Sequence, residues 1–197
     1  MSKVISAHSV SVDGYITGRN PGAGRGLGDA PMLFDWYSDG DTPSQVFNAF
    51  RLSEPSARVF DALAGRVGAS LAGRNTYDDS GWSEGGTPHP TAPLVVLSHR
   101  PAPQSYERQT FVTTGIEDAI AAAREAAGDK DVALMGGGAA TAALKAGLVD
   151  ELVLHQVPIL LGGGRPFFQS LPEHVRLRLV EAVPAPGVTH LHYEVMR

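Results

Sequence analysis

The sequence contains no cysteine in 197 residues, and this absence removes several kinds of chemistry at once. Disulfide bonds, thiolate nucleophiles, cysteine-ligated zinc and iron–sulfur clusters are all excluded. Charge is also sparse, since charged residues make up 19% of the chain and the formal net charge is −5. No basic stripe stands out, and we therefore expect no nucleic-acid partner.

Long apolar runs and internal repeats are likewise missing from the sequence. We find neither a stretch long enough for a membrane helix nor the apolar core of a signal peptide. Hydrophobic residues still make up 43% of the chain, which is enough for a sizeable core. We therefore expect a single domain over residues 1–197, a cytoplasmic location and no membrane partner.

Signatures of metal-dependent catalysis are absent too. No H-x-E with P-C-x-x-C marks a nucleotide deaminase. His190 and His192 lie two residues apart on a predicted strand, but no carboxylate motif accompanies them. We therefore expect no metal site.

Strand-like and helix-like segments alternate along most of the chain. Short apolar runs predict strands, and two segments with helical features, one of them alanine-rich and ending at Gly128, predict helices. The last two segments both alternate like strands. This order predicts a three-layer α/β fold in which a mostly parallel sheet carries an antiparallel C-terminal edge. The predicted strands are Val4–His8, Gly68–Ala72, Leu94–Ser98, Phe111–Thr113, Glu151–Leu161, Arg176–Val183 and Thr189–Met196, and the predicted helices are Ser53–Leu63 and Ile116–Ala127.

The stretch from Val132 to Pro158 reads as a strand, a triple glycine, a helix and a second strand. Gly136, Gly137 and Gly138 carry no Cβ, so the chain can turn sharply and an anion can approach the backbone closely. A helix that opens at about Ala139 would point its free N–H groups and its positive dipole end at that anion. Replacing Gly137 with valine should then block the site. An ordinary strand-to-helix turn would also explain the glycines, whose spacing fits neither a G-x-G-x-x-G fingerprint nor a P-loop.

Five motifs follow one another in a distinctive order, namely Ser11–Ile16, Ala72–Tyr77, Val95–Ser98, Met135–Gly138, and Leu148–Leu152 with Pro158–Gly164. Together they resemble the dihydrofolate reductase-like superfamily, and most closely its RibD C-terminal domain branch, from residue 4 to about residue 168. The resemblance implies a central, mostly parallel eight-stranded sheet with flanking helices. It also implies that NADPH binds along the strand ends and that the protein is a homodimer.

The resemblance assigns one group of residues to the cofactor phosphates. Gly73, Arg74 and Thr76 match the Gly-Arg-x-Thr motif that holds these phosphates in dihydrofolate reductases. A guanidinium and a hydroxyl at a strand end can both reach phosphate oxygens. The alternative is an ordinary strand-to-helix cap with Thr76 as the N-cap residue.

A second group would surround the adenosine ribose. Ser98, His99 and Arg100 follow the next strand, where the family places small hydroxyl and basic residues. A positive charge there would select the 2′-phosphate of NADP, although Arg100 can equally be a solvated loop charge. The predicted cofactor set is completed by the glycine turn and the start of its helix, Gly136, Gly137, Gly138, Ala139 and Thr141.

Two carboxylates are candidates for the substrate side. Asp13 belongs to a Ser-Val-Asp-Gly segment that resembles a family signature, and it would contact substrate, order the loop or simply form an Asp-Gly turn. Asp35 lies among aromatic residues. There it could act as the poorly solvated acid that assists protonation in dihydrofolate reductases.

These features predict an NADPH-dependent reductase that transfers hydride to a small conjugated heterocycle of the pterin, pyrimidine or flavin type. The alternative is a nucleotide-binding protein of the same fold without catalytic turnover. We also expect the glycine-rich loop over residues 14–28 to close over the site. Apolar residues around Phe167 and Phe168 would form the dimer contact, unless these rings fill the monomer core.

Overall fold

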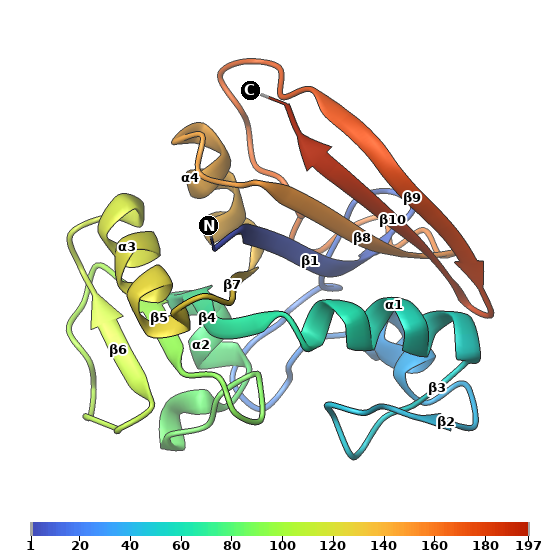
Figure 1. The fold of residues 1–197 in the computed structure, drawn as a ribbon, viewed down its shortest axis with the longest axis horizontal. Coiled ribbons are helices and arrows are strands. Elements are labelled where there is room, and N and C mark those ends of the chain that lie inside the picture. The colour runs from blue at the N-terminus through green and yellow to red at the C-terminus, as the bar shows by residue number, and fades with distance from the viewer. Residues whose placement is uncertain (1, 197) are drawn as a thin grey trace.

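An eight-stranded sheet in the order β6-β5-β4-β7-β1-β8-β10-β9 runs through the computed structural model, which describes residues 2–196 (Figure 1). All strands from β6 to β8 are parallel, whereas β10 and β9 are antiparallel to their neighbours. The predicted mostly parallel sheet with an antiparallel C-terminal edge is therefore confirmed. The strands are β1 (Val4–Ser11), β4 (Val67–Gly73), β5 (Leu94–Leu97), β6 (Gln109–Val112), β7 (Asp131–Met135), β8 (Glu151–Val157), β9 (Leu177–Ala185) and β10 (Val188–Val195).

Helices cover both faces of this sheet. One apolar core joins the sheet to α3 (Ile116–Ala127) and α4 (Gly137–Lys145). Two smaller clusters lie on the opposite face, under the remaining helices. These are the α-helices α1 (Glu54–Ala64) and α2 (Arg74–Asp79) and the 3₁₀ helices η1 (Pro31–Tyr37) and η2 (Trp82–Glu84), with the short strands β2 (Thr42–Pro43) and β3 (Arg51–Leu52) beside them.

Helix α3 illustrates how closely the sequence pattern fits its layer. Its buried side chains Ala119, Ala123 and Ala127 recur every four residues, so a stripe of small groups faces the sheet. The helix ends at Gly128, whose φ of +60° suits a residue without a Cβ. Both helix bounds agree with the prediction.

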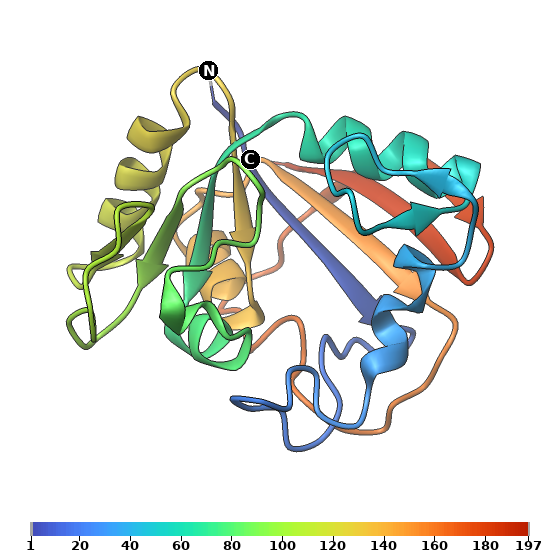
Figure 2. The same ribbon diagram turned by 90° about the horizontal axis from the view of Figure 1, so that it is seen from below.

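The parallel strands all end at one edge of the sheet. Figure 2 shows their arrowheads pointing the same way, toward the long loop that follows β1. The edge therefore gathers Gly73, Ser98 and the glycine turn, which lie far apart in the sequence. This is the edge at which parallel α/β sheets bind ligands.

Some boundaries differ from the prediction. Strand β8 ends at Val157 rather than at Leu161, because Pro158 has no N–H to continue the ladder. The residues beyond it pair instead with the loop after β1, through an isolated bridge between Tyr15 and Pro166. Helix η1 and the β2–β3 pair were not predicted, because they lie in or near the loop region, where periodicity gives no signal.

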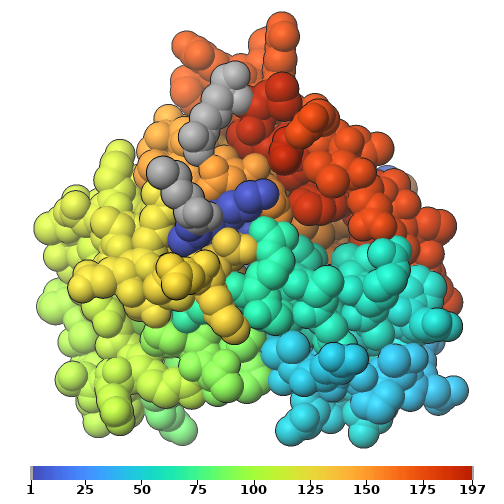
Figure 3. Space-filling model, in the orientation of Figure 1, coloured from blue at the N-terminus to red at the C-terminus, as the bar shows by residue number. Residues whose placement is uncertain are grey.

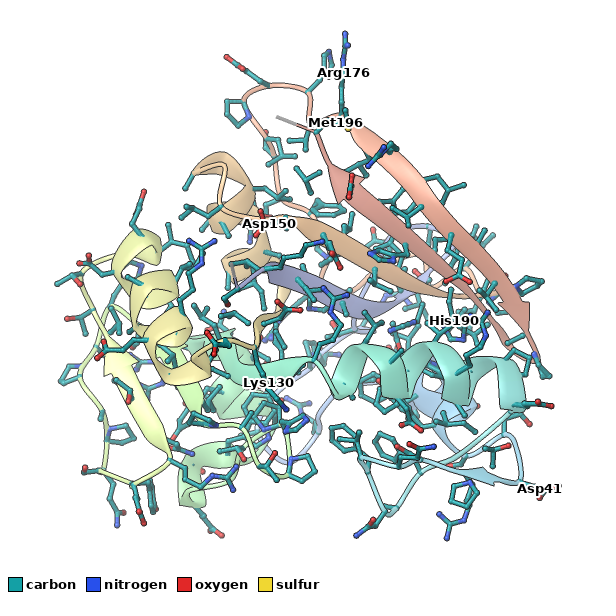
Figure 4. The ribbon with its side chains drawn as sticks, viewed as in Figure 1. Asp41, Lys130, Asp150, Arg176, His190 and Met196 are labelled. Carbon is teal, nitrogen blue, oxygen red and sulfur yellow. The ribbon has the colours of Figure 1, made fainter. Side chains whose placement is uncertain are left out.

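A chain of buried polar side chains fills the space between α1 and the C-terminal strands. Ser56 Oγ lies 2.9 Å from His190 Nε2, and His190 Nδ1 lies 2.8 Å from His155 Nδ1. One Nδ1 must donate and the other accept, so both rings cannot be protonated while this bond exists. Figure 4 shows His190 where the C-terminal strands face α1.

A second polar cluster closes the opposite, amino-terminal edge of the parallel sheet. The buried carboxylate of Glu151 receives hydrogen bonds from Arg66 and Lys3 and lies 3.1 Å from His192 Nε2. Burial alone would raise the pKa of Glu151, but its bonds to His192, Arg66 and Lys3 lower it below the usual range. His192 is therefore directed to an ion cluster rather than toward His190. Within residues 2–196, no group of three or more metal-ligating side chains is suited to hold a metal ion, and no helix is long and apolar enough to cross a membrane.

Acid should destabilise this fold through the buried histidines. Burial lowers the pKa of His190 to about 4 and holds the pKa of His155 well below its usual 6.5. The unfolded chain binds these protons near pH 6.5, so the free energy of unfolding should fall as the pH drops from 6.5 toward 4. We expect a loss of about 2 kcal/mol at pH 5 for a histidine whose folded pKa is near 4. Urea unfolding at pH 7, 6 and 5 measures this, and an unchanged midpoint would contradict it.

Candidate functional site

The glycine turn between β7 and α4 is held from two sides. Gly136 has a φ of +88°, and its N–H donates a 2.7 Å hydrogen bond to His8 Nε2. A Cβ at this position would collide with Thr76 Oγ1. Only glycine therefore fits between β1 and α2 here, and the turn brings Thr76 against the start of α4.

The next two glycines have different surroundings. A Cβ on Gly137 would lie 2.5 Å from the carbonyl oxygen of Phe167, whereas one on Gly138 would meet no atom within 4 Å. Gly138 is also exposed, while Gly136 and Gly137 are buried. The expectation that a valine at position 137 would fill a phosphate position is therefore wrong, because that side chain would collide with the backbone of Phe167. Gly138 is the position open to an anion.

The start of α4 offers hydrogen-bond donors at this open position. The N–H groups of Gly137, Gly138 and Ala139 belong to the first turn, which has no intrahelical acceptors for them. The Ala139 side chain is buried, and its Cβ lies 3.8 Å from the point that a Cβ on Gly73 would occupy. Ala139 thus packs α4 against the end of β4, and its contribution to a ligand would be its backbone N–H.

Arg74 and Arg100 converge on one carboxylate. Arg74 Nε donates a 2.8 Å hydrogen bond to Asp78, and Arg100 Nη2 lies 3.7 Å from the same carboxylate. The Arg74 guanidinium also lies 5.8 Å from the centre of the Tyr77 ring and 5.9 Å from that of Phe111. The structure therefore brings the two predicted basic residues together at the end of α2.

Two hydroxyl groups that were predicted to contact the cofactor form hydrogen bonds with backbone groups instead. Ser98 is buried, and its Oγ donates to the Arg100 carbonyl at 2.7 Å and accepts from the Arg100 N–H at 3.0 Å. Thr141 is also buried and accepts a 3.1 Å hydrogen bond from the N–H of Gln169. Both side chains therefore shape the backbone near the site, and His99 is exposed in the turn that Ser98 closes.

Asp13 fastens the loop after β1. Its carboxylate accepts hydrogen bonds from Ser11 Oγ at 2.6 Å and from the N–H groups of Leu161 and Gly162 at 3.1 and 2.7 Å. These bonds, led by that from Ser11, lower the pKa of Asp13. The carboxylate is therefore ionised at neutral pH, which suits the loop-ordering role and does not provide an acid.

Asp35 does not have the surroundings that its predicted role requires. It lies exposed on η1, at the rim of an open cavity of about 720 Å³ that Phe34, Met32 and Ile159 also line. The buried side chains of this helix are those of Leu33 and the neighbouring Trp36, whose indole N–H donates to Ser9 Oγ at 3.0 Å. The 3₁₀ geometry of η1 thus directs the indole inward and leaves the carboxylate in solvent.

The glycine-rich loop is tied to the segment that follows β8. Ile16 N–H donates to the Arg165 carbonyl at 3.0 Å, Phe167 N–H donates to the Gly14 carbonyl at 2.8 Å, and Arg19 donates to Gly162. An ion pair between the Arg165 side chain and Asp79 joins the same segment to α2. The loop over residues 12–19 and the segment over residues 159–167 together form a strap along the carboxyl edge of the sheet. The strap is fixed to both β1 and α2.

Sequence reasoning missed His8, Asp78 and Arg165. His8 had one detectable signal, an ionisable ring inside the first buried strand. The role of Arg165 depends on the fold, because its partner Asp79 is 86 residues away.

The model of the RibD C-terminal domain family matches residues 2–191, and the chain belongs to this family. A solved structure from Shewanella sp. PV-4, of a protein named for riboflavin biosynthesis, is 28% identical, covers 100% of both chains and superposes with a TM-score of 0.71. No protein with a curated description matches the sequence significantly.

Two further structures share the fold. A pyrimidine reductase-like protein from Corynebacterium diphtheriae is 17% identical, with 100% of this chain and 92% of that chain covered and a TM-score of 0.63. A diaminohydroxyphosphoribosylaminopyrimidine deaminase/5-amino-6-(5-phosphoribosylamino)uracil reductase from Thermotoga maritima is 10% identical, with a TM-score of 0.62. There the match covers 99% of this chain and 57% of that chain, so this chain spans little more than half of that protein.

Gly136 and Gly138 should respond differently to alanine. Gly136→Ala should lower the free energy of unfolding by about 1–3 kcal/mol, because it combines a positive φ with a collision against Thr76. Gly138→Ala should be neutral or raise stability by about 0.5 kcal/mol, because its Cβ enters open space on a helix. Urea unfolding of both variants tests this, and equal losses would show that the turn is not arranged as described.

Proposed function

We propose that this protein is an NADP-dependent reductase that transfers hydride to a small conjugated heterocycle. The observation that carries the proposal is the exposed Gly138 at the start of α4, with open space where a side chain would stand. Helix N-termini of this kind bind phosphate groups through backbone N–H groups and the helix dipole. Membership of the RibD C-terminal domain family supports the same function.

The residues at the carboxyl edge fit such a cofactor. The N–H groups of Gly137, Gly138 and Ala139, with the hydroxyl of Thr76, would hold its pyrophosphate. Arg74 and Arg100 would hold the 2′-phosphate, because guanidinium groups form strong paired bonds with phosphate oxygens. The cofactor, when bound, supplies the hydride.

The chain would contribute alignment of the cofactor and the heterocycle rather than a strong acid. Asp13 is ionised and bound to backbone N–H groups, and Asp35 is exposed. Neither carboxylate is a buried proton donor of the kind that raises proton-transfer rates. We therefore infer that water delivers the proton that accompanies the hydride, while the strap formed by residues 12–19 and 159–167 covers the heterocycle.

The same observation favours a second candidate, a nucleotide-binding protein without turnover. Such a protein would keep the glycine turn and need no acid. For the reductase, a pyrimidine is the acceptor type that the names of the structural relatives support.

Cofactor binding should appear as a thermal shift. NADPH should raise the melting temperature more than NADH at equal concentration, because only NADPH carries the 2′-phosphate for Arg74 and Arg100. Gly138→Glu should fold but lose the shift, because its carboxylate would stand where the anion binds, whereas the matched Gly138→Ala should retain most of it. An undiminished shift in Gly138→Glu would exclude the turn as the cofactor site.

Turnover then separates the two candidates. Oxidation of NADPH, followed by its absorbance, is measured with pyrimidine, pterin and flavin acceptors. Consumption that depends on one acceptor supports the reductase. Tight binding without consumption across the panel supports the binding protein.

We also propose that the protein is a homodimer formed through its C-terminal strands. The edge strand β9 exposes Leu177, Leu179 and Val180, and a neighbouring cavity of about 840 Å³ is lined largely by apolar residues. These strands form an outer flank of the molecule in Figure 3. Phe167 is buried and belongs to the monomer core, and half-buried Phe168 packs against it with ring centres 4.2 Å apart.

The dimer should depend on β9. Light scattering should give twice the 20.7 kDa chain mass for the wild type. Leu179→Asp should give a folded monomer, because it places a charge in the apolar contact. Leu160→Asp changes an equally apolar exposed residue in the segment after β8, outside the C-terminal strands, and should remain dimeric. A monomeric wild type at micromolar concentration would contradict the proposal.

A further inference from the structure

His8 connects the first strand to the glycine turn. It lies in β1, in register with Leu154 of β8, and its Nε2 accepts the Gly136 N–H at 2.7 Å. Its ring also contacts the Phe167 ring, with centres 4.4 Å apart. The imidazole thus touches both segments that surround the start of α4.

The partners of His8 settle its tautomer. A backbone N–H can only donate, so Nε2 must carry a lone pair and the ring hydrogen must be on Nδ1. Nδ1 lies 3.4 Å from Ser6 Oγ, which in turn lies 3.5 Å from the Leu134 carbonyl oxygen. Burial lowers the pKa of His8 to about 4, so the ring is neutral at physiological pH and its lone pair remains available.

This arrangement fixes the peptide that precedes α4. Gly136 is confined between His8, which takes its N–H, and Thr76, which fills the space on the other side. Because Gly136 has no Cβ, several orientations of its peptide would be accessible without these two contacts. With this N–H turned inward, the N–H groups of Gly137, Gly138 and Ala139 remain as the donors of the first turn.

We propose that His8 is a positioning residue that sets the geometry of the anion-binding turn, acting through the backbone of Gly136. The inference rests on the proposed binding of cofactor phosphate at this turn. His8 itself is not a proton donor for a substrate, because Nε2 carries no hydrogen and the Nδ1 hydrogen faces Ser6 of the same strand.

Three variants test this role. His8→Leu removes the acceptor and keeps apolar contact with Phe167. His8→Gln can return an oxygen to about the position of Nε2. His174→Leu, at an exposed histidine before β9, is the matched control. NMR measures the hydrogen exchange of the Gly136 amide and the ring nitrogen shifts of His8. Titration calorimetry measures the Kd for NADPH.

We expect the His8 ring of the wild type to show the Nδ1–H tautomer. In His8→Leu, the Gly136 amide should exchange faster and the Kd should rise about tenfold, as for the loss of one hydrogen bond. His8→Gln should restore both, and the control should change neither. If His8→Leu does not fold, Ser6→Ala frees Nδ1 and should produce a smaller change of the same sign in both readouts.

Two results would overturn the proposal. One is an Nε2–H tautomer in the wild type, and the other is unchanged Gly136 exchange in His8→Leu or its substitute Ser6→Ala. Absence of NADPH binding by the wild type would instead reject the proposed function. In that case, the tautomer and the Gly136 exchange still decide whether His8 holds the turn.

Discussion

The left-handed turn at Gly136 is the constraint on which the rest of the site depends. It joins the end of β7 to the start of α4 in a space bounded by His8 of β1 and Thr76 of α2. Neither a side chain nor a different backbone angle fits there. The turn therefore determines where α4 begins and which of its N–H groups face outward.

Charge around the turn is balanced by the short helix α2. Asp78 pairs with Arg74 and lies near Arg100, and Asp79 pairs with Arg165 of the strap. These acids hold the basic side chains close to the carboxyl edge. An incoming phosphate would compete with the acids for the guanidinium groups, which links ligand binding to the position of α2 and of the strap.

Local patterns predicted much of the fold and part of the site. The alanine stripe and Gly128 gave both ends of α3, and the ordered motifs placed the glycine turn beside the Arg74 segment at one sheet edge. The sequence could not distinguish Gly137 from Gly138, because the difference lies in the carbonyl of Phe167, thirty residues further along. It also could not show that the hydroxyls of Ser98 and Thr141 are engaged by backbone groups, or that η1 leaves Asp35 in solvent. Each of these depends on tertiary contacts that residue type and spacing do not encode.

We propose that the phosphates of a nucleotide cofactor bind at the start of α4. An NMR titration of the backbone amides with NADP can test this proposal, because every N–H near the ligand reports separately. We expect the largest shifts on Gly137, Gly138 and Ala139, with smaller ones at Thr76. Shifts confined to the cavity beside Phe34, or no shifts at millimolar NADP, would contradict it.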